Sequence, residues 1–231
     1  MRRKTLAHLL LATCALCALF SGLAIFDQAW EYVYGWLGVA LLLQAIDPQR
    51  VLPHEPAQLS LASPFASDSR VAPAAAFLTT AFVPIIAMLH AGFLDGPGGI
   101  AVASVALLTA LYRLAYQEAS GPTVHQFVGL PAMWSVVGFY LHAFDATPLV
   151  AALAIGLGIL LGLARFRWPH PIWSDRWTSA TRGMTAVWVI TAALTLWSGL
   201  PASATAKGIF LVAALYGISL AILMARENSA S

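Results

Sequence analysis

Apolar runs long enough to cross a lipid bilayer as helices recur eight times along the 231-residue chain. The hydrocarbon core of a bilayer is about 30 Å thick, so a spanning helix needs about 20 mostly apolar residues. Charged residues make up 10% of the chain and hydrophobic residues 60%, whereas a soluble domain is about 25% charged. No soluble core could bury this much apolar side chain. The pattern therefore predicts an all-α polytopic membrane protein, a single integral membrane domain over residues 1–231.

The expected helices are separated by short polar turns and by two longer loops. Glycine and proline inside several runs do not argue against helices, because neighbouring groups in a membrane bundle can satisfy the freed backbone. We place the eight helices near residues 5–26, 29–46, 71–93, 99–117, 127–145, 147–164, 183–200 and 205–225.

The basic residues favour one orientation of these helices. With the N-terminus in the cytoplasm, eleven of the twelve Lys and Arg residues lie on the cytoplasmic side, and only Lys207 lies outside. The short external turns instead carry Asp27, Asp95 and Asp145. Cytoplasmic loops of membrane proteins carry an excess of Lys and Arg, so we expect both termini in the cytoplasm.

Two cytoplasmic loops are long, and the second is rich in arginine and tryptophan. The first covers residues 47–70; the second, RFRWPHPIWSDRWTSATR, carries Arg165, Arg167, Arg176 and Arg182 among three tryptophans. Two interpretations of this loop stay open: ordinary interfacial anchors, or a patch that binds anionic lipid phosphates. The net charge of +2 is too small to suggest nucleic acid as a partner.

An aromatic stretch opens the second expected helix on its outer side. AWEYVYGW places Trp30, Tyr32, Tyr34 and Trp36 there. Tryptophan and tyrosine are enriched where membrane meets water, so we interpret all four as an interfacial belt.

Several short motifs, taken in order along the chain, resemble one family of lipid enzymes. The stretch HLLLATCALCALFSGLAIFDQAWEYVYGWLGVALLLQAID (8–47) combines a small-residue first helix, the aromatic entry YGWLG and an aspartate at the end of the second helix. FVPIIAMLHAG, FVGLPAMW and WPHPIW follow in the corresponding order. The chain resembles the bacterial phosphatidylcholine synthases, which are CDP-alcohol phosphatidyltransferases, over most of its length.

This resemblance implies an eight-helix bundle in the bacterial inner (cytoplasmic) membrane and a role in phospholipid biosynthesis. The family joins CDP-diacylglycerol to choline and releases CMP. Its motif D-x-x-D-G-x-x-A-R, followed by G-x-x-x-D-x-x-x-D on the next helix, implies two divalent cations, Mg or Mn. Carboxylates spaced three or four residues apart share one helix face, and the cations neutralise the pyrophosphate and the leaving group.

The chain departs from that motif at most of its positions. The family's first aspartate falls on Gln44, the second on Asp47, and the arginine arrives early as Arg50. The corresponding positions of the next helix hold no carboxylate and fall near Ser69, Ala72 and Ala76. A single remaining carboxylate is a poor basis for a two-cation site, because magnesium in such sites takes one or two carboxylates plus substrate phosphates.

Each candidate residue has a structural interpretation beside its functional one. Asp47 is either the solvated end of the second helix or a vestigial metal ligand, and Arg50 beside it is an ion-pair partner or a phosphate contact. Gln44, one turn inward, is expected to form an interhelical hydrogen bond. Arg113 is expected to snorkel to the interface, with a phosphate contact as the alternative.

Two hypotheses about function follow from these residues. The first is a phosphatidylcholine synthase-like protein of phospholipid biosynthesis that is divergent or inactive, because most metal-binding aspartates are missing. The second is a non-catalytic subunit of the same fold that binds membrane phospholipid, CDP-diacylglycerol or a protein partner. A homodimer stays open. Mg or Mn rests on the resemblance alone, and a protein without either metal is the alternative.

The charge pattern makes a topological prediction. Reporter fusions within residues 47–70 and within residues 165–182 should both report a cytoplasmic position, because the basic residues concentrate there. A periplasmic signal from either fusion would mean that the number of spanning helices is wrong.

Overall fold

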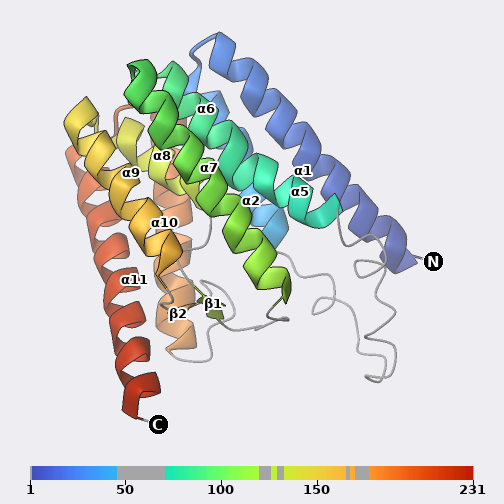
Figure 1. Ribbon diagram of the computed structural model, residues 1–231, viewed down its shortest axis with the longest axis vertical. Helices are drawn as coiled ribbons and strands as arrows, with labels where there is room; N and C mark the ends of the chain where they lie inside the picture. The colour runs from blue at the N-terminus through green and yellow to red at the C-terminus, as the bar shows by residue number, and fades with distance from the viewer. Residues whose placement is uncertain are drawn as a thin grey trace.

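The computed structural model of the protein describes residues 2–45, 71–119, 126–128, 133–164, 167–169 and 177–230. These residues form a bundle of eight helical segments, which confirms the all-α prediction (Figure 1). Its segments are α1 (Arg2–Phe26), α2 (Trp30–Ala45), the continuous α5 (Val71–Phe77), η2 (Leu78–Phe82) and α6 (Val83–His90), then α7 (Gly96–Ala119), α8 (Trp134–Ala143), α9 (Pro148–Leu163), α10 (Thr178–Ser198) and α11 (Ala204–Ala230). A short antiparallel ribbon pairs β1 (Gln126–Val128) with β2 (Arg167–Pro169).

Two helix starts differ from the prediction. Helix α8 begins at Trp134 rather than near residue 127, because residues 126–128 pair with β2 instead. A proline at position 131 also disfavours helical backbone at the residue before it. Helix α10 begins at Thr178 rather than near residue 183, so Arg182 lies within a helix and not in a loop.

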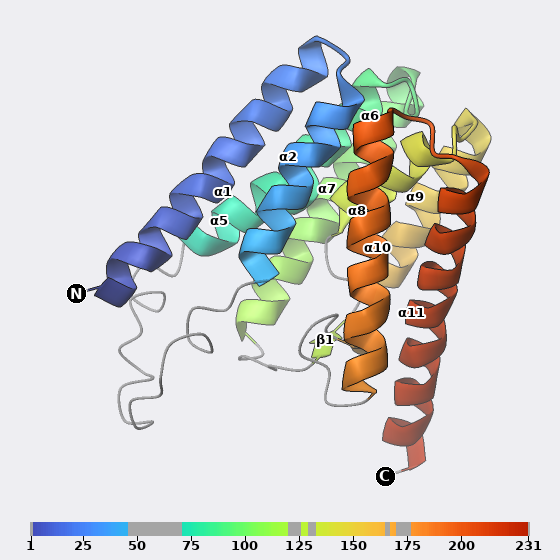
Figure 2. The same ribbon diagram turned by 180° about the vertical axis from the view of Figure 1, so that it is seen from behind.

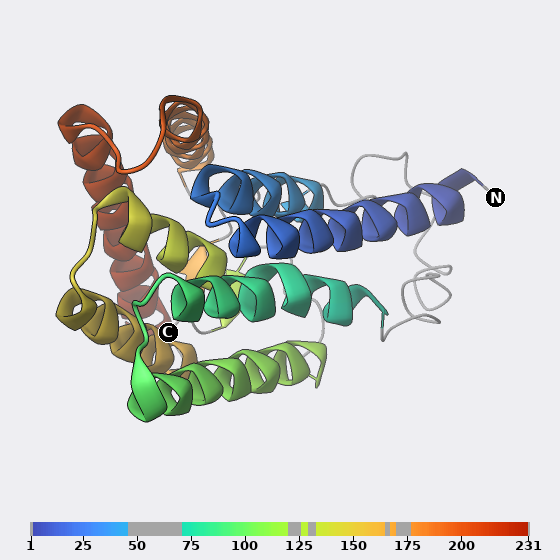
Figure 3. The ribbon, with the colours of Figure 1, turned by 90° about the horizontal axis from the view of Figure 1, so that it is seen from above.

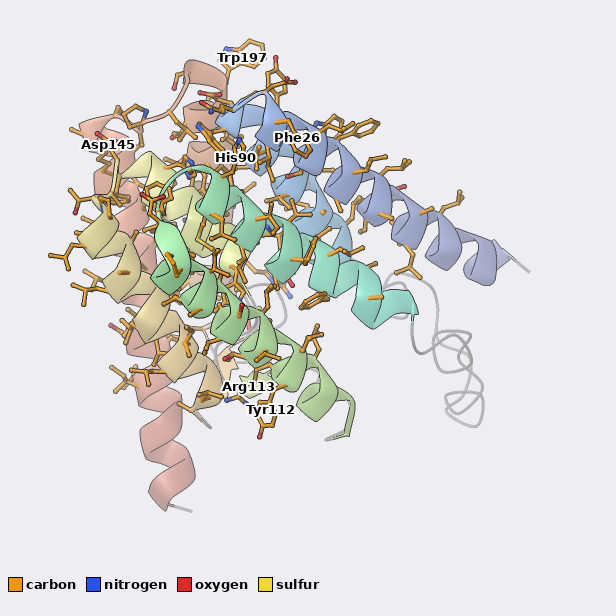
Figure 4. The ribbon with its side chains drawn as sticks, turned by 45° about the horizontal axis from the view of Figure 1, so that its top comes forward. Phe26, His90, Tyr112, Arg113, Asp145 and Trp197 are labelled. Carbon is orange, nitrogen blue, oxygen red and sulfur yellow. The ribbon has the colours of Figure 1, made fainter. Side chains whose placement is uncertain are left out.

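The helices alternate in direction, and the short turns collect at one end of the bundle. The turns at residues 27–29, 91–95 and 144–147 lie at the top of Figure 1, which we call the turn end. Helices α2, α7, α9 and α11 finish toward the opposite end, which we call the loop end. Figure 4 shows Phe26 and Asp145 toward the turn end and Arg113 toward the loop end.

Helix α8 occupies the middle of the bundle (Figure 3). It packs against α2, α6, η2 and α9. One buried apolar cluster forms around Phe139 of α8 and Phe210 of α11, and a second around Ile85, Met88 and Ile155. Seen from behind, α10 runs beside α2 (Figure 2). The central helix therefore ties the first half of the chain to the second.

The surface of the bundle is apolar and several of its buried side chains are polar. Large apolar side chains point outward on most helices; among them are Leu19, Leu23, Leu108, Leu153, Leu160, Leu194, Trp197 and Leu215. Buried polar side chains include Ser21, Thr79, Thr109, Ser135, Thr181, Thr191 and Thr195. A water-soluble protein does not expose contiguous apolar area on this scale, so the bundle is a membrane protein.

Length and composition identify membrane-spanning candidates among the described helices. Three stretches are long and apolar enough to cross a bilayer: Leu9–Phe26, Gly96–Leu114 and Ala204–Leu223. Two shorter apolar helical stretches accompany them, Ala74–His90 and Pro148–Leu163. All five coincide with helices that the sequence predicted.

Glycines allow the closest approaches around α8. A Cβ on Gly138 would lie 2.8 Å from the Tyr34 hydroxyl oxygen, and a Cβ on Gly158 of α9 would lie 3.0 Å from the Trp134 ring. Small residues at helix interfaces let neighbouring elements approach closely, which is how membrane helices gain packing energy without a hydrophobic drive.

Candidate functional site at the loop end

A polar contact joins α2 to η2 in the region where the sequence placed the motif positions. The Gln44 Nε2 atom donates a hydrogen bond to the Thr79 hydroxyl at 2.6 Å. Thr79 is fully buried. Its hydroxyl is in turn within donating distance of two carbonyl oxygens, that of Ala75 at 3.0 Å and that of Ala76 at 3.2 Å. The interhelical hydrogen bond predicted for Gln44 is confirmed.

Thr79 lies in a wide helical turn. The N–H of Val83 donates to the carbonyl of Leu78, five residues earlier, as in a π-helix. Pro84 follows directly and has no N–H to continue the ordinary helical pattern. A π-helical turn inserts one extra residue, and such turns are frequent at functional sites. This turn changes the face that α5 presents relative to α6.

The structure describes only part of the predicted motif. Ala76 lies three residues before Thr79 on the same helix, is partly buried and has no metal-binding atom in its side chain. Ala72 lies in α5, but its side chain is outside the described residues. Asp47, Arg50 and Ser69 also lie outside the described residues.

Arg113 has a different environment from the one predicted. Only 3% of its surface is exposed. Its Nε atom donates to the carbonyl of Gly162 and its Nη2 atom to the carbonyl of Ala164. The last carbonyls of a helix have no intrahelical donors and carry partial negative charge. Arg113 therefore turns toward the end of α9, and the prediction that it snorkels to the interface is wrong.

Two of the other predicted arginines, Arg167 and Arg182, lie in described elements toward the loop end. Arg182 is exposed on α10, next to Thr181, whose hydroxyl is hydrogen-bonded to the Tyr216 hydroxyl at 2.9 Å. Arg167 lies in β2, where the structure describes the strand pairing but not the side chain. Arg165 and Arg176 lie outside the described residues.

Comparison with known proteins identifies the relatives of this chain. No family model matches it. It is 26% identical to a phosphatidylcholine synthase of Bradyrhizobium diazoefficiens over 192 residues, which are 82% of this chain and 69% of that protein. It is 26% identical to a phosphatidylcholine synthase of Pseudomonas aeruginosa over 187 residues, 81% of this chain and 77% of that protein.

A phosphatidylcholine synthase of Rhizobium meliloti is 23% identical over 185 residues, 79% of this chain and 74% of that protein. The chain is a relative of the bacterial phosphatidylcholine synthases. The resemblance predicted from the order of its motifs is confirmed, since each of these relatives bears the name phosphatidylcholine synthase.

Kinship with phosphatidylcholine synthases raises the question of a cation site at the loop end. Gln44 has a neutral amide whose nitrogen is hydrogen-bonded to Thr79, and the side chain of Ala76 has no atom that could bind a metal. No group of three His, Cys, Asp or Glu side chains among the described residues could hold a metal ion. Bound magnesium requires anionic oxygen ligands in addition to waters. The described part of this region does not fit a two-cation site.

One buried polar pair was missed by the sequence analysis. Tyr34 was assigned to an interfacial belt, but it is 3% exposed and its hydroxyl oxygen lies 2.8 Å from His142 Nδ1. Tyr32 is 67% exposed and Trp36 38% exposed. Helical spacing could have separated them, because Tyr32 and Trp36 are four residues apart on one face while Tyr34 shares a face with the buried Leu37.

Replacing Thr79 with valine should destabilise the protein. Valine keeps the shape but removes the partner of Gln44, and interhelical hydrogen bonds in membrane proteins contribute about 1 kcal/mol. Thr80→Val is the matched control, because the Thr80 hydroxyl donates only within its own helix, to the Ala76 carbonyl at 2.7 Å. Thermal unfolding in detergent should show a lower midpoint for Thr79→Val than for Thr80→Val. Equal midpoints would refute an interhelical role.

Proposed function

We propose that this chain binds phospholipid or CDP-activated lipid at its loop end and does not carry out the metal-dependent transfer of phosphatidylcholine synthases. The proposal makes it a divergent, non-catalytic member of a lipid-biosynthetic family. The observation that carries it is the direct hydrogen bond from Gln44 to Thr79, in the region where the resemblance implies metal-bound carboxylates.

The side chains around Gln44 and Thr79 support the absence of a two-cation site. Two cations that neutralise a pyrophosphate need anionic oxygens from both helices. The Gln44 amide and the Thr79 hydroxyl are neutral, and the alanines at positions 72 and 76 have no side-chain oxygen. Asp47 remains, and Arg50 lies three residues after it in the sequence. An exposed ion pair between the two would contribute at most about 1 kcal/mol.

Lipid binding is supported by the charge at the loop end. The arginines at 165, 167, 176 and 182 accompany three tryptophans in the sequence. Basic clusters beside membrane helices attract anionic headgroups, by about 1 kcal/mol per residue near the surface. In this proposal the loop end faces the cytoplasm, both termini are cytoplasmic, and the protein resides in the bacterial inner membrane.

An active phosphatidylcholine synthase is the second candidate. The alignments favour it, because similarity to a protein of that name extends over 82% of this chain. In that case the chain would join choline to CDP-diacylglycerol with Mg or Mn, and Asp47 would be one of the cation ligands.

An assay of the purified protein separates the two candidates. With radiolabelled choline, CDP-diacylglycerol and manganese, we expect no labelled phosphatidylcholine, and Asp47→Asn should leave both the assay and the unfolding midpoint unchanged. A phosphatidylcholine synthase related to this chain, such as that of Pseudomonas aeruginosa, serves as the positive control. Manganese-dependent synthesis that Asp47→Asn abolishes would overturn the non-catalytic proposal.

Lipid binding itself can be tested with charge-removing variants. Replacing Arg165, Arg167, Arg176 and Arg182 together with glutamine should weaken retention of anionic phospholipid in native mass spectrometry, because about 1 kcal/mol of attraction is lost per residue. Lys207→Gln is the control, since Lys207 is at the turn end, where its ammonium lies 5.9 Å from the Phe144 ring centre. Equal retention by the wild type and the quadruple variant would contradict a lipid-binding loop end.

A further inference from the structure

Arg113 of α7 contacts the end of α9 through the backbone. Its guanidinium donates to the carbonyls of Gly162 and Ala164. Ala164 has an extended backbone conformation with ψ of 146°, so the helix ends there and the chain departs toward β2. Hydrogen bonds from a charged donor are stronger than neutral ones, and a cation is favoured at a helix C-terminus. The contact therefore fixes the point where the chain leaves α9.

The same end of α9 is held in close contact with the helices on either side of β1. A Cβ on Gly162 would lie 2.9 Å from Cγ2 of Thr109, which precedes Arg113 by one helical turn on α7. A Cβ on Gly158 would lie 3.0 Å from the ring of Trp134, the first residue of α8. Helix α7 leads into β1 and α8 follows it, so both flanks of β1 contact α9.

The helices that make these contacts lie next to the described strand pair along the chain. Strand β1 pairs antiparallel with β2, with Gln126 opposite Pro169 and Val128 opposite Arg167. Strand β2 begins four residues after the last residue of α9 and packs against α11. The positions of both strands thus depend on how α7 and α8 meet the end of α9.

We propose that Arg113 is a positioning residue that holds the β1–β2 ribbon in place. In this proposal the ribbon, rather than Arg113 itself, contributes to the surface at the loop end that binds lipid phosphate. This inference rests on the proposed function only for its lipid-binding part. Arg113 donates to backbone carbonyls within the bundle and is nearly fully buried. The ribbon that it supports carries Arg167 on β2 at the loop end (Figure 1).

Amide hydrogen exchange in detergent, followed by mass spectrometry, tests the positioning role. Arg113→Lys keeps the positive charge but not the planar fork of donors. We expect the amides of residues 126–128, 167 and 168 to exchange about tenfold faster in this variant, since hydrogen bonds to charged groups are worth that factor or more. Unchanged exchange in the ribbon would overturn the proposal.

A second pair of variants tests the same junction without touching a charge. Gly162→Ala should speed exchange in the ribbon, because its Cβ would collide with Thr109 Cγ2. Thr109→Ser removes that methyl group and keeps the hydroxyl that donates to the Val105 carbonyl at 2.8 Å, so adding it to Gly162→Ala should restore slow exchange. Gly156→Ala is the control, since nothing lies within 4 Å of a Cβ there. Fast exchange in the control as well would mean that α9 tolerates no added methyl and would refute the specific junction.

Lipid retention by the same variants separates this inference from the proposed function. Arg113→Lys and Gly162→Ala should both lose anionic phospholipid in native mass spectrometry, and the Thr109→Ser/Gly162→Ala double variant should regain it. If the wild type retains no lipid, the proposed function fails while the exchange data still decide the positioning role. If Gly162→Ala speeds exchange but keeps its lipid, the ribbon is built as proposed and its part in lipid binding is refuted.

Discussion

The hydrocarbon core of a bilayer contains no water, and this is the constraint on which the rest of the structure depends. A polar group in the hydrocarbon core must find its partner within the protein. The Ser21 hydroxyl donates to the Val33 carbonyl at 3.0 Å, and the Tyr140 hydroxyl to the Phe210 carbonyl at 3.0 Å. Trp188 Nε1 in turn donates to the Tyr140 hydroxyl at 2.9 Å. Each of these bonds joins two helices, so the need to satisfy polar groups also orders the helices.

The same constraint shapes the chemistry of the loop end. Gln44 and Thr79 satisfy each other across α2 and η2, and Arg113 is satisfied by the carbonyls that end α9. In both contacts, polar side chains form hydrogen bonds that hold helices together. In a two-cation transferase the corresponding carboxylates would bind metal, and the substrate's phosphates would complete the site. The non-catalytic proposal follows from this change of partners.

Several features were predictable because they depend on short stretches of sequence. Hydropathy over about 20 residues located the helices, since that length is set by bilayer thickness. The bond of Gln44 was predictable because a polar side chain one turn inside a membrane helix needs a partner. Tyr34 was misassigned, because enrichment of aromatics at the interface was given more weight than helical spacing, and spacing places Tyr34 on the buried face with Leu37.

The sequence by itself determined the fold class, the approximate positions of the helices that the structure describes and the resemblance to phosphatidylcholine synthases, because hydropathy, helix length and motif order are properties of the chain read in one dimension. The tertiary structure decided which polar groups meet. The ribbon pairs residue 126 with residue 169, and Arg113 bonds to a carbonyl 49 residues away. Such contacts depend on how α7, α8 and α9 pack. Packing of helices in a bilayer is set by close approach of small residues such as Gly158 and Gly162, and their spacing does not specify which helices will meet there.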